Sequence, residues 1–182
     1  MKKRPATILL AALVIAASLL DGCTAGNSSD EGRRAGKSTV FIEKVVDGDS
    51  VEAVIQGSRE HIRLIGIDAP ELAQRPWGKR AKKRLEQMVA ASGWEVRIEY
   101  DVERRDMHQR ILAYLWGRDG KMINEEMVRN GYAVVFTFPP NVKYVERFKA
   151  AQVIARENKL GIWGKAGLRQ LPSDYRREHP RL

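Results

Sequence analysis

The stretch from Val45 to Glu71, VVDGDSVEAVIQGSREHIRLIGIDAPE, decides the fold of this chain. Two runs of mostly β-forming residues, 51–55 and 61–65, flank the turn signal Gln56-Gly57-Ser58. The simplest structure for this pattern is a β-hairpin. The two ends of a hairpin lie close together, so residues before the first strand and after the second are expected to meet.

Acidic turns stand at both ends of this stretch. Asp47-Gly48-Asp49 leads into the hairpin, and Asp68-Ala69-Pro70-Glu71 follows a third apolar run. Antiparallel pairing would bring both turns to the same edge of the sheet, where their oxygen atoms would suit a hard cation such as Ca²⁺. Either turn alone is better explained as an ordinary turn. Their combination with Arg63 between them favours a functional site.

The same residues resemble the thermonuclease family, also called staphylococcal nuclease-like. Val46–Val51 and Ile62–Glu71 carry the first two motifs, and Arg110–Tyr114, Asn124–Ala133 and Leu160–Trp163 carry three more. The five blocks follow the family's order and spacing, which makes the signal strong. The resemblance implies an α+β, mainly β, architecture, in which an OB-fold five-stranded barrel carries three helices.

The resemblance also implies a reaction, the Ca²⁺-dependent hydrolysis of phosphodiester bonds in DNA and RNA, with single-stranded or unpaired regions favoured and 3′-phosphate ends left. Hydrolysis by water places extra negative charge on the phosphate oxygens, so the site needs cations around the phosphorus and a base near the water. Carried over position by position, the roles fall on the catalytic residues Arg63, Glu71 and Arg110, and on the calcium ligands Asp49, Asp68 and the carbonyl of Ala69.

Simpler explanations exist for the charged residues. Arg63 could be a strand residue paired with Glu60 or Glu52, and Arg110 could bond the carbonyls of a turn. Asp47 and Asp106 are expected to be structural, the first as a turn former and the second as a partner that fixes a loop.

Two residues or segments depart from the family pattern, a mild change at Ser50 that keeps the hydroxyl and a more serious one before Arg110. Ser50 stands where threonine is usual, and Met107-His108-Gln109 precedes Arg110 where a Tyr-Gly pair is common. The missing glycine matters if that turn requires a positive φ angle. His108 could replace the tyrosine as a phosphate contact, or it is an exposed loop residue. Phe136 and Phe138 are either core aromatics or platforms on which bases stack.

The N-terminus is expected to direct export. A basic start and an apolar run mark residues 1–22 as a signal peptide. The lone Cys23 resembles the cysteine of a bacterial lipobox, although Asp21 departs from that pattern, so we expect a lipoprotein anchored to a membrane through Cys23. A conventional cleavage at Cys23-Thr24-Ala25 would instead give a secreted protein. Residues 23–37 are expected to form a flexible tether.

The remainder of the chain predicts one domain, 38–164, and a mobile basic tail, 165–182. A helix is expected around residues 81–89, strands at 94–100 and 111–116, a helix with Asn124 as N-cap and Gly131 just past its end, and a last helix capped by Asn141. We expect a monomer.

The formal charge of +9 favours polyanionic partners, with nucleic acid as the first candidate. The main alternative function is a non-catalytic OB-fold lipoprotein that binds nucleic acid or another polyanion. A membrane-tethered cell-wall protein is a third. The intact set of acids and arginines argues against both, because neither function needs it.

Overall fold

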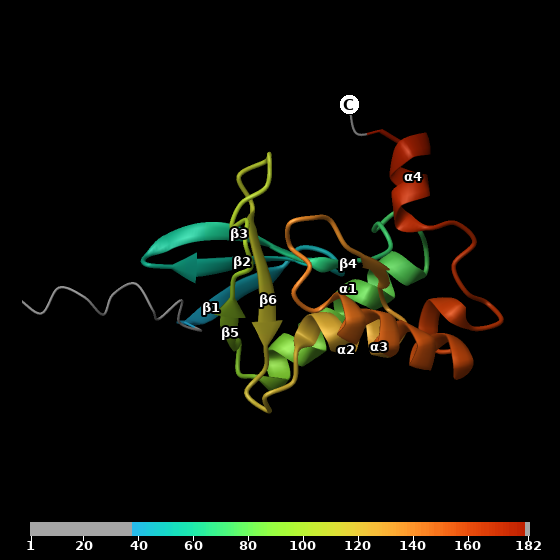
Figure 1. Cartoon of the computed structure of the whole chain (residues 1–182), viewed down its shortest axis with the longest axis horizontal. Coiled ribbons are helices and arrows are strands. Elements are labelled where there is room, and N and C mark those ends of the chain that lie inside the picture. Colours follow the sequence, from blue (N-terminus) through green and yellow to red (C-terminus); the bar gives the residue numbers. More distant parts are fainter. Residues whose placement is uncertain (1–37, 181–182) are drawn as a thin grey trace, which may run out of the picture. The chain divides into compact units, whose positions relative to one another are not determined.

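The structure of the chain is a computed structural model, which describes residues 38–180 (Figure 1). Five strands close into a barrel in the order β1-β2-β3-β6-β5, which confirms the predicted five-stranded architecture. The barrel strands are β1 (Ser38–Val45), β2 (Ser50–Ile55), β3 (Ser58–Leu64), β5 (Glu95–Glu99) and β6 (Ile111–Trp116).

The hairpin on which the sequence analysis centred is β2 and β3. The two strands pair antiparallel from Ser50 opposite Arg63 to Ile55 opposite Ser58. Gln56 and Gly57 form the turn with φ angles of 51° and 81°. Two positive φ angles are typical of the tight hairpin turn whose twist matches that of the strands. The open end of the hairpin therefore carries Asp49 and the residues after β3.

The barrel closes through a parallel pair. β3 lies beside β6 with Arg63 opposite Leu112, and β6 in turn pairs antiparallel with β5. This parallel register brings the start of β6 close to the end of β3. Arg110, which immediately precedes β6, is thereby carried to the same edge of the barrel as Arg63.

A second, two-stranded sheet supports that edge. β4 (Gly66–Asp68) pairs antiparallel with β7 (Val134–Phe136), with Asp68 opposite Val134. All three residues of β4 are buried. Asp68 is consequently fixed at the end of a buried strand, while the partner strand leads outward to Phe136.

Helices cover the barrel. Figure 1 shows α1 (Trp77–Ala91), α2 (Ile123–Arg129) and α3 (Val145–Glu157) grouped on one side of it. A 3-10 turn, η1 (Gly161–Trp163), follows, and its Ile162 is buried. The fourth helix, α4 (Pro172–Glu178), lies in the segment predicted to be a mobile tail without periodicity. The prediction of three helices was therefore one short. Within residues 38–180, no helix is long and apolar enough to cross a membrane.

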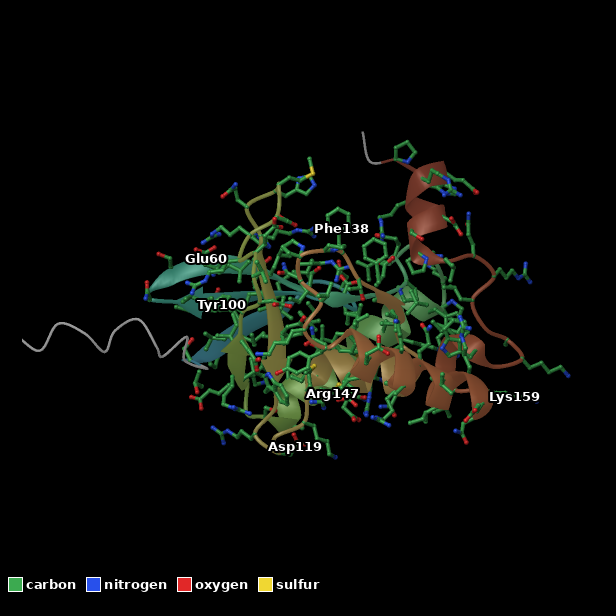
Figure 2. All side chains as sticks on the ribbon, in the orientation of Figure 1. Glu60, Tyr100, Asp119, Phe138, Arg147 and Lys159 are labelled. Carbon is green, nitrogen blue, oxygen red and sulfur yellow. The ribbon has the colours of Figure 1, made fainter. Side chains whose placement is uncertain are left out.

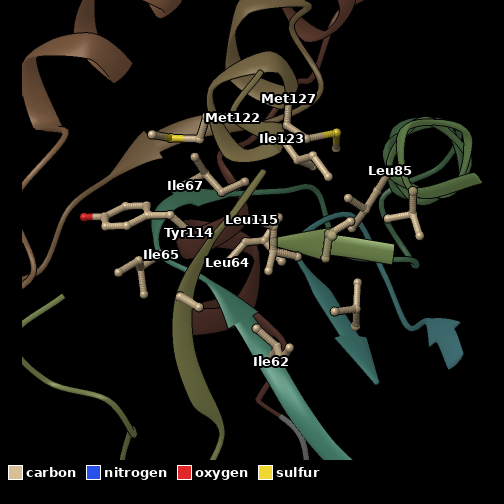
Figure 3. Close-up of a cluster of buried hydrophobic side chains, with 14 of the residues drawn as sticks. Ile62, Leu64, Ile65, Ile67, Leu85, Tyr114, Leu115, Met122, Ile123 and Met127 are labelled. Carbon is tan, nitrogen blue, oxygen red and sulfur yellow. The ribbon is translucent and has the colours of Figure 1, made fainter. Parts of the chain in front are cut away.

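The hydrophobic core joins the barrel to the helices (Figure 3). Ile62 and Leu64 of β3 point inward, and Leu85 of α1 and Met127 of α2 close over them. All four side chains are fully shielded from water. Burying a side chain of this size contributes about 1.5–3 kcal/mol, so this core holds the edge that carries the charged residues.

Two predicted helix caps were wrong. The N-cap of α2 is Met122, and Asn124 lies inside the helix, fully buried. The Asn124 amide accepts a hydrogen bond from the backbone of Leu115 at 2.9 Å and donates one to the carbonyl of Ile65 at 2.9 Å. The amide therefore ties α2 to the barrel. Gly131, with a φ angle of 70°, does follow the C-cap as expected.

Asn141 is also not a cap, because α3 begins only at Val145. Its amide accepts a hydrogen bond from the backbone N–H of Glu103 at 2.8 Å and donates one to the carbonyl of the same residue at 3.0 Å. The side chain thus bonds both backbone groups of Glu103, as a neighbouring β-strand would, and joins the loop before β6 to the loop after β7. The buried residues of α3 are Phe148, Ala151 and Ala155.

Candidate active site

The charged edge of the barrel borders a cleft of about 850 Å³. The loops before β2, after β3, before β6 and after β7 contribute to its wall, and α4 forms a further part. The sequence-predicted residues that line it are Asp49, Arg63, Glu71, His108, Arg110, Phe136 and Phe138. Residues far apart in the sequence are therefore gathered around one opening.

Asp49 and Asp68 lie within reach of a single positive group. Nη2 of Arg63 is 3.2 Å from Oδ2 of Asp49 and 3.4 Å from Oδ1 of Asp68. The backbone N–H of Ala69 donates to Oδ2 of Asp49 at 2.7 Å, which links the two acidic turns directly. The predicted convergence of the two turns is present in the fold.

Local contacts hold Asp49 in place. Oδ1 of Asp47 accepts a hydrogen bond from the backbone N–H of Asp49 at 3.0 Å, as expected of a turn former. A Cβ atom added at Gly48 would lie 2.6 Å from that of Ala69 and 2.7 Å from that of Ala81. The turn can approach α1 and the Asp68 loop this closely only because residue 48 has no side chain.

Burial sets the protonation of Asp49. Because desolvation disfavours the charged form, the pKa of Asp49 rises to about 7, and the positive charge of Arg63 offsets this only in part. Asp49 is 6% exposed and Asp68 is fully buried. Two carboxylates this close and this deeply buried need a cationic partner, since burying unpaired charge is costly.

Arg63 does not pair with either glutamate that the simpler explanation proposed. Glu60 bonds Arg105 through both of its oxygens, at 2.8 and 3.0 Å, and Glu52 pairs with Lys44 at 3.5 Å. Nη1 of Arg63 instead donates to the carbonyl of Leu64 at 2.7 Å, which turns the guanidinium toward the aspartates and the cleft.

Glu71 is held by Gln74, which lies in the loop before α1. Its backbone N–H donates to Oε1 of Gln74 at 2.9 Å, and its carbonyl accepts from the backbone of Gln74 at 2.8 Å. The side chain is mostly shielded, at 18% exposed, and lines the cleft. Oε1 accepts a hydrogen bond from Arg176 at 3.0 Å.

Arg110 is held by Asp106, the partner expected to fix its loop. Oδ2 of Asp106 lies 2.8 Å from Nε and 2.7 Å from Nη2 of Arg110. Burial opposes the ionisation of Asp106, but the hydrogen bonds and charge of Arg110 outweigh it and keep the pKa of Asp106 below its usual value. Arg110 thus fixes its loop and also faces the cleft.

The turn that aims Arg110 does require a positive φ angle. Gln109 adopts a φ angle of 62°, within the segment Met107-His108-Gln109 where the resemblance implies a Tyr-Gly pair. Arg105 donates to the carbonyl of Gln109 at 2.6 Å and so supports the strained turn. His108, one residue earlier, is exposed and lines the cleft.

The two aromatic residues are outside the core. Phe136 is 44% exposed and Phe138 is 73% exposed, and both line the cleft. Figure 2 shows Phe138 extending from the loop after β7. Because rings this exposed contribute little to packing, the alternative of core aromatics does not hold for them.

Sequence reasoning missed Arg176 and His179 of the C-terminal segment, and both line the cleft. Nη1 and Nη2 of Arg176 each bond one oxygen of Asp68, at 2.9 Å in both cases. A local signal for α4 was present, because Pro172 stands at its first turn with Asp174 close behind, and both favour a helix start. Nothing local signals that Arg176 meets Asp68.

The acidic residues fit one hard cation with a small number of protein ligands. Residues 38–180 contain no group of three or more His, Cys, Asp or Glu side chains arranged to hold a metal ion. Asp49 and Asp68 are nevertheless close enough to share one guanidinium nitrogen. Ca²⁺ accepts backbone carbonyls and water beside carboxylates, so this pair is compatible with it.

The family comparison agrees with the fold. The family model described as "Staphylococcal nuclease homologue" matches residues 61–165, more than half of the chain. Cys23 and the segments assigned to export and tethering lie outside the described residues, and the match does not include them.

Curated relatives resemble the chain over most of its length. The thermonuclease of Staphylococcus hyicus is 32% identical over 163 residues, which cover 86% of this chain and 94% of that protein. The thermonuclease of Staphylococcus intermedius is 35% identical over 128 residues, 68% of this chain and 74% of that protein.

Endonuclease YncB of Bacillus subtilis (strain 168) is 32% identical over 135 residues, which cover 70% of this chain. The match spans 63% of the length of YncB, and a match to the prophage-derived endonuclease YokF spans 45% of that protein. The family match, these relatives and the closed barrel agree, and the chain belongs to the staphylococcal nuclease homologue family.

Proposed function

We propose that the protein is a nuclease that hydrolyses phosphodiester bonds of DNA and RNA, depends on Ca²⁺ and leaves 3′-phosphate ends. The observation that carries the proposal is the convergence of Asp49, Glu71 and two arginines on a single cleft, with the buried Asp68 joined to it through Arg63. The similarity to proteins named thermonuclease and endonuclease supports the same reaction class.

Two guanidinium groups would receive the phosphate. Arg63 on β3 and Arg110, which directly precedes the neighbouring β6, both line the cleft, and each carries planar donors that match phosphate oxygens. Both are already oriented, by Leu64 and by Asp106 respectively. Donors fixed in this way stabilise the charge that builds up in the transition state without having to reorganise.

The calcium ion would be held by Asp49 and Asp68, with the carbonyl of Ala69 and water completing its ligands. When bound, the ion would supply further positive charge to a phosphate oxygen. Asp49 would release its proton before ligation, because a metal binds the carboxylate form.

Glu71 would act on the attacking water. Its carboxylate lines the cleft that also receives the two arginines, and Gln74 fixes its backbone. Accepting a proton from the water or aligning it toward phosphorus are the two roles open to a carboxylate there. Phe136, Phe138 and His108 would contact the neighbouring bases and phosphates, which favours single-stranded or unpaired substrate.

The test is a cleavage assay on single-stranded DNA and RNA with Ca²⁺ and with chelator, followed by analysis of the termini. We expect 3′-phosphate ends in Ca²⁺ and no cleavage with chelator. Salt-sensitive binding that is unaffected by chelator and creates no new ends would identify the protein as a non-catalytic binder instead.

We further propose export and attachment to a membrane through a lipid on Cys23. The support is the basic and apolar pattern of residues 1–22 and the position of the lone cysteine. Cys23→Ser should move the protein from the membrane fraction to the soluble exported fraction. An unchanged distribution would rule out the anchor and leave the secreted form.

A further inference from the structure

We propose that Arg176 of α4 is a positioning residue that holds Asp68 and Glu71 and competes with Ca²⁺ for the Asp68 carboxylate. The inference rests on the proposed function, because it assumes that Asp68 is a calcium ligand. It adds a residue from the C-terminal segment to the site and makes α4 sensitive to the metal.

Arg176 binds the same carboxylate oxygens of Asp68 that a calcium ion would need. Each terminal nitrogen of Arg176 bonds a different oxygen of Asp68, at 2.9 Å, and Nη1 also bonds Oε1 of Glu71 at 3.0 Å. A forked guanidinium bound in this way occupies both oxygens of the carboxylate. Ca²⁺ would need at least one of those oxygens at about 2.3–2.6 Å, so the cation and the guanidinium cannot both keep their full contacts.

The local charge also disfavours the simultaneous binding of Ca²⁺ and Arg176. In their ionised forms, Asp49, Asp68 and Glu71 contribute three negative charges, and Arg63 and Arg176 contribute two positive charges, so the group has a formal charge of −1. Adding a divalent cation while Arg176 stays in place would give the group a formal charge of +1. If the cation replaces Arg176, the formal charge would be zero. Asp68 is fully buried, so an uncompensated positive charge beside it is poorly screened.

The helix that carries Arg176 is attached in a way that permits release. Pro172 is the buried residue of α4, and the side chain of Arg176 is 38% exposed. The segment before the helix is anchored separately, since Gln74 donates to the carbonyl of Gln170 at 2.9 Å and Trp77 to that of Ala166 at 3.1 Å. Loss of the Arg176 contacts would therefore free α4 while the preceding segment stays on the domain.

The experiment measures Ca²⁺ binding by calorimetry for the protein and for Arg176→Gln. We expect Arg176→Gln to bind Ca²⁺ about tenfold more tightly, within the usual range of coupling between two sites. Arg176→Lys, which keeps the charge but loses the fork, should fall between the two. Arg177→Gln is the matched control, because Arg177 is on the same helix, its side chain is 72% exposed, and it pairs with Asp174.

A second measurement does not depend on any variant. By reciprocity, Ca²⁺ should weaken the hold on α4, so hydrogen exchange of residues 172–178 should accelerate when Ca²⁺ is added. Equal Ca²⁺ affinity in the protein and in Arg176→Gln, or unchanged exchange in α4, would overturn the inference alone. Absence of Ca²⁺ binding in every variant would overturn the calcium site itself, and the inference with it.

Discussion

Arg63 has two tasks at the scale of single residues. It neutralises Asp49 and Asp68 in a buried position, and its side chain, 14% exposed, still lines the cleft. A substitution of Arg63 would therefore alter the charge balance around Asp49 and Asp68 and also remove the proposed contact to phosphate. A substitution of Arg110 would remove a phosphate contact without disturbing the predicted calcium ligands, because the ion-pair partner of Arg110 is Asp106.

Arg110→Ala should lower kcat/KM by about 10²–10³-fold, as expected when one donor to the transition state is lost. Calcium affinity should stay unchanged, since Asp49 and Asp68 keep their contacts. Arg118→Ala is the control, because Arg118 forms an exposed pair with Glu95 away from the cleft. Normal turnover in a folded Arg110→Ala protein would show that Arg110 has no role in catalysis.

The raised pKa of Asp49 predicts how stability depends on pH in the absence of calcium. An unfolded Asp releases its proton near pH 4, whereas folded Asp49 keeps its proton up to about pH 7. Between these values the folded state binds more protons, so the free energy of unfolding should fall as pH rises.

Urea unfolding from pH 4.5 to 7.5 with chelator measures this slope. Asp49→Asn, which keeps an acceptor for the N–H of Ala69, should remove the Asp49 contribution. Parallel curves for the two proteins would contradict the prediction. Because the metal displaces the proton, calcium affinity of the unchanged protein should rise over the same pH range.

Gln109 has a strained φ angle of 62° in the turn that aims Arg110. Gln109→Gly should raise the free energy of unfolding by about 1 kcal/mol, because only glycine adopts this conformation without steric cost. Met107→Gly is the control within the same loop, since Met107 is exposed and has no positive φ angle. A gain of equal size in both variants would show that strain at residue 109 is not the cause.

At the scale of elements, the buried amide of Asn124 decides how α2 sits on the barrel. It bonds Leu115, Ile65 and Ala113, which belong to β6 and to the link between β3 and β4. The link leads directly into β4, which ends at Asp68. The position of the buried Asp68 therefore depends on a helix that does not line the cleft.

Asn124→Ala should cost at least about 2 kcal/mol of unfolding free energy, because it leaves buried backbone groups without partners. Asn158→Ala, which removes an exposed amide bonded to the carbonyl of Ile154, should cost far less. Denaturant unfolding of both variants measures the difference. Similar losses in the two would show that the buried bonds are not the source.

Element boundaries were predictable where the signal is local. The hairpin turn, β6 and the face of α1 follow from residues a few positions apart. The roles of Asn124 and Asn141 were not predictable, because an asparagine before an apolar run is typical of a helix cap. Their actual partners, Leu115 and Glu103, are set by how the elements pack.

At the scale of the whole molecule, the positive charge of the chain bears on substrate capture. The formal charge is +9, while the cleft itself holds acids as well as arginines. The acids serve the proposed metal and water, so attraction of the polymer falls to the surrounding Lys and Arg side chains. Such attraction releases counterions from the nucleic acid and is weakened by salt.

Binding of single-stranded DNA to Glu71→Gln in the presence of chelator should therefore weaken as salt rises. A plot of log affinity against log salt should have a slope of about −2 or steeper, which corresponds to three phosphates at about −0.7 each. Fluorescence anisotropy at several salt concentrations measures it. A slope near zero would show that charge does not drive binding.

The amino-acid sequence by itself determined the barrel, its family and the cleft residues Asp49, Arg63, Glu71 and Arg110, because strand periodicity, turn chemistry and ordered motifs are carried by neighbouring residues. Only the tertiary structure decided that Gln109 takes a positive φ angle, that Asn124 joins helix to barrel, and that Arg176 binds Asp68 from 108 residues away. An ion pair between segments so distant depends on where packing brings each backbone, and no local pattern records that.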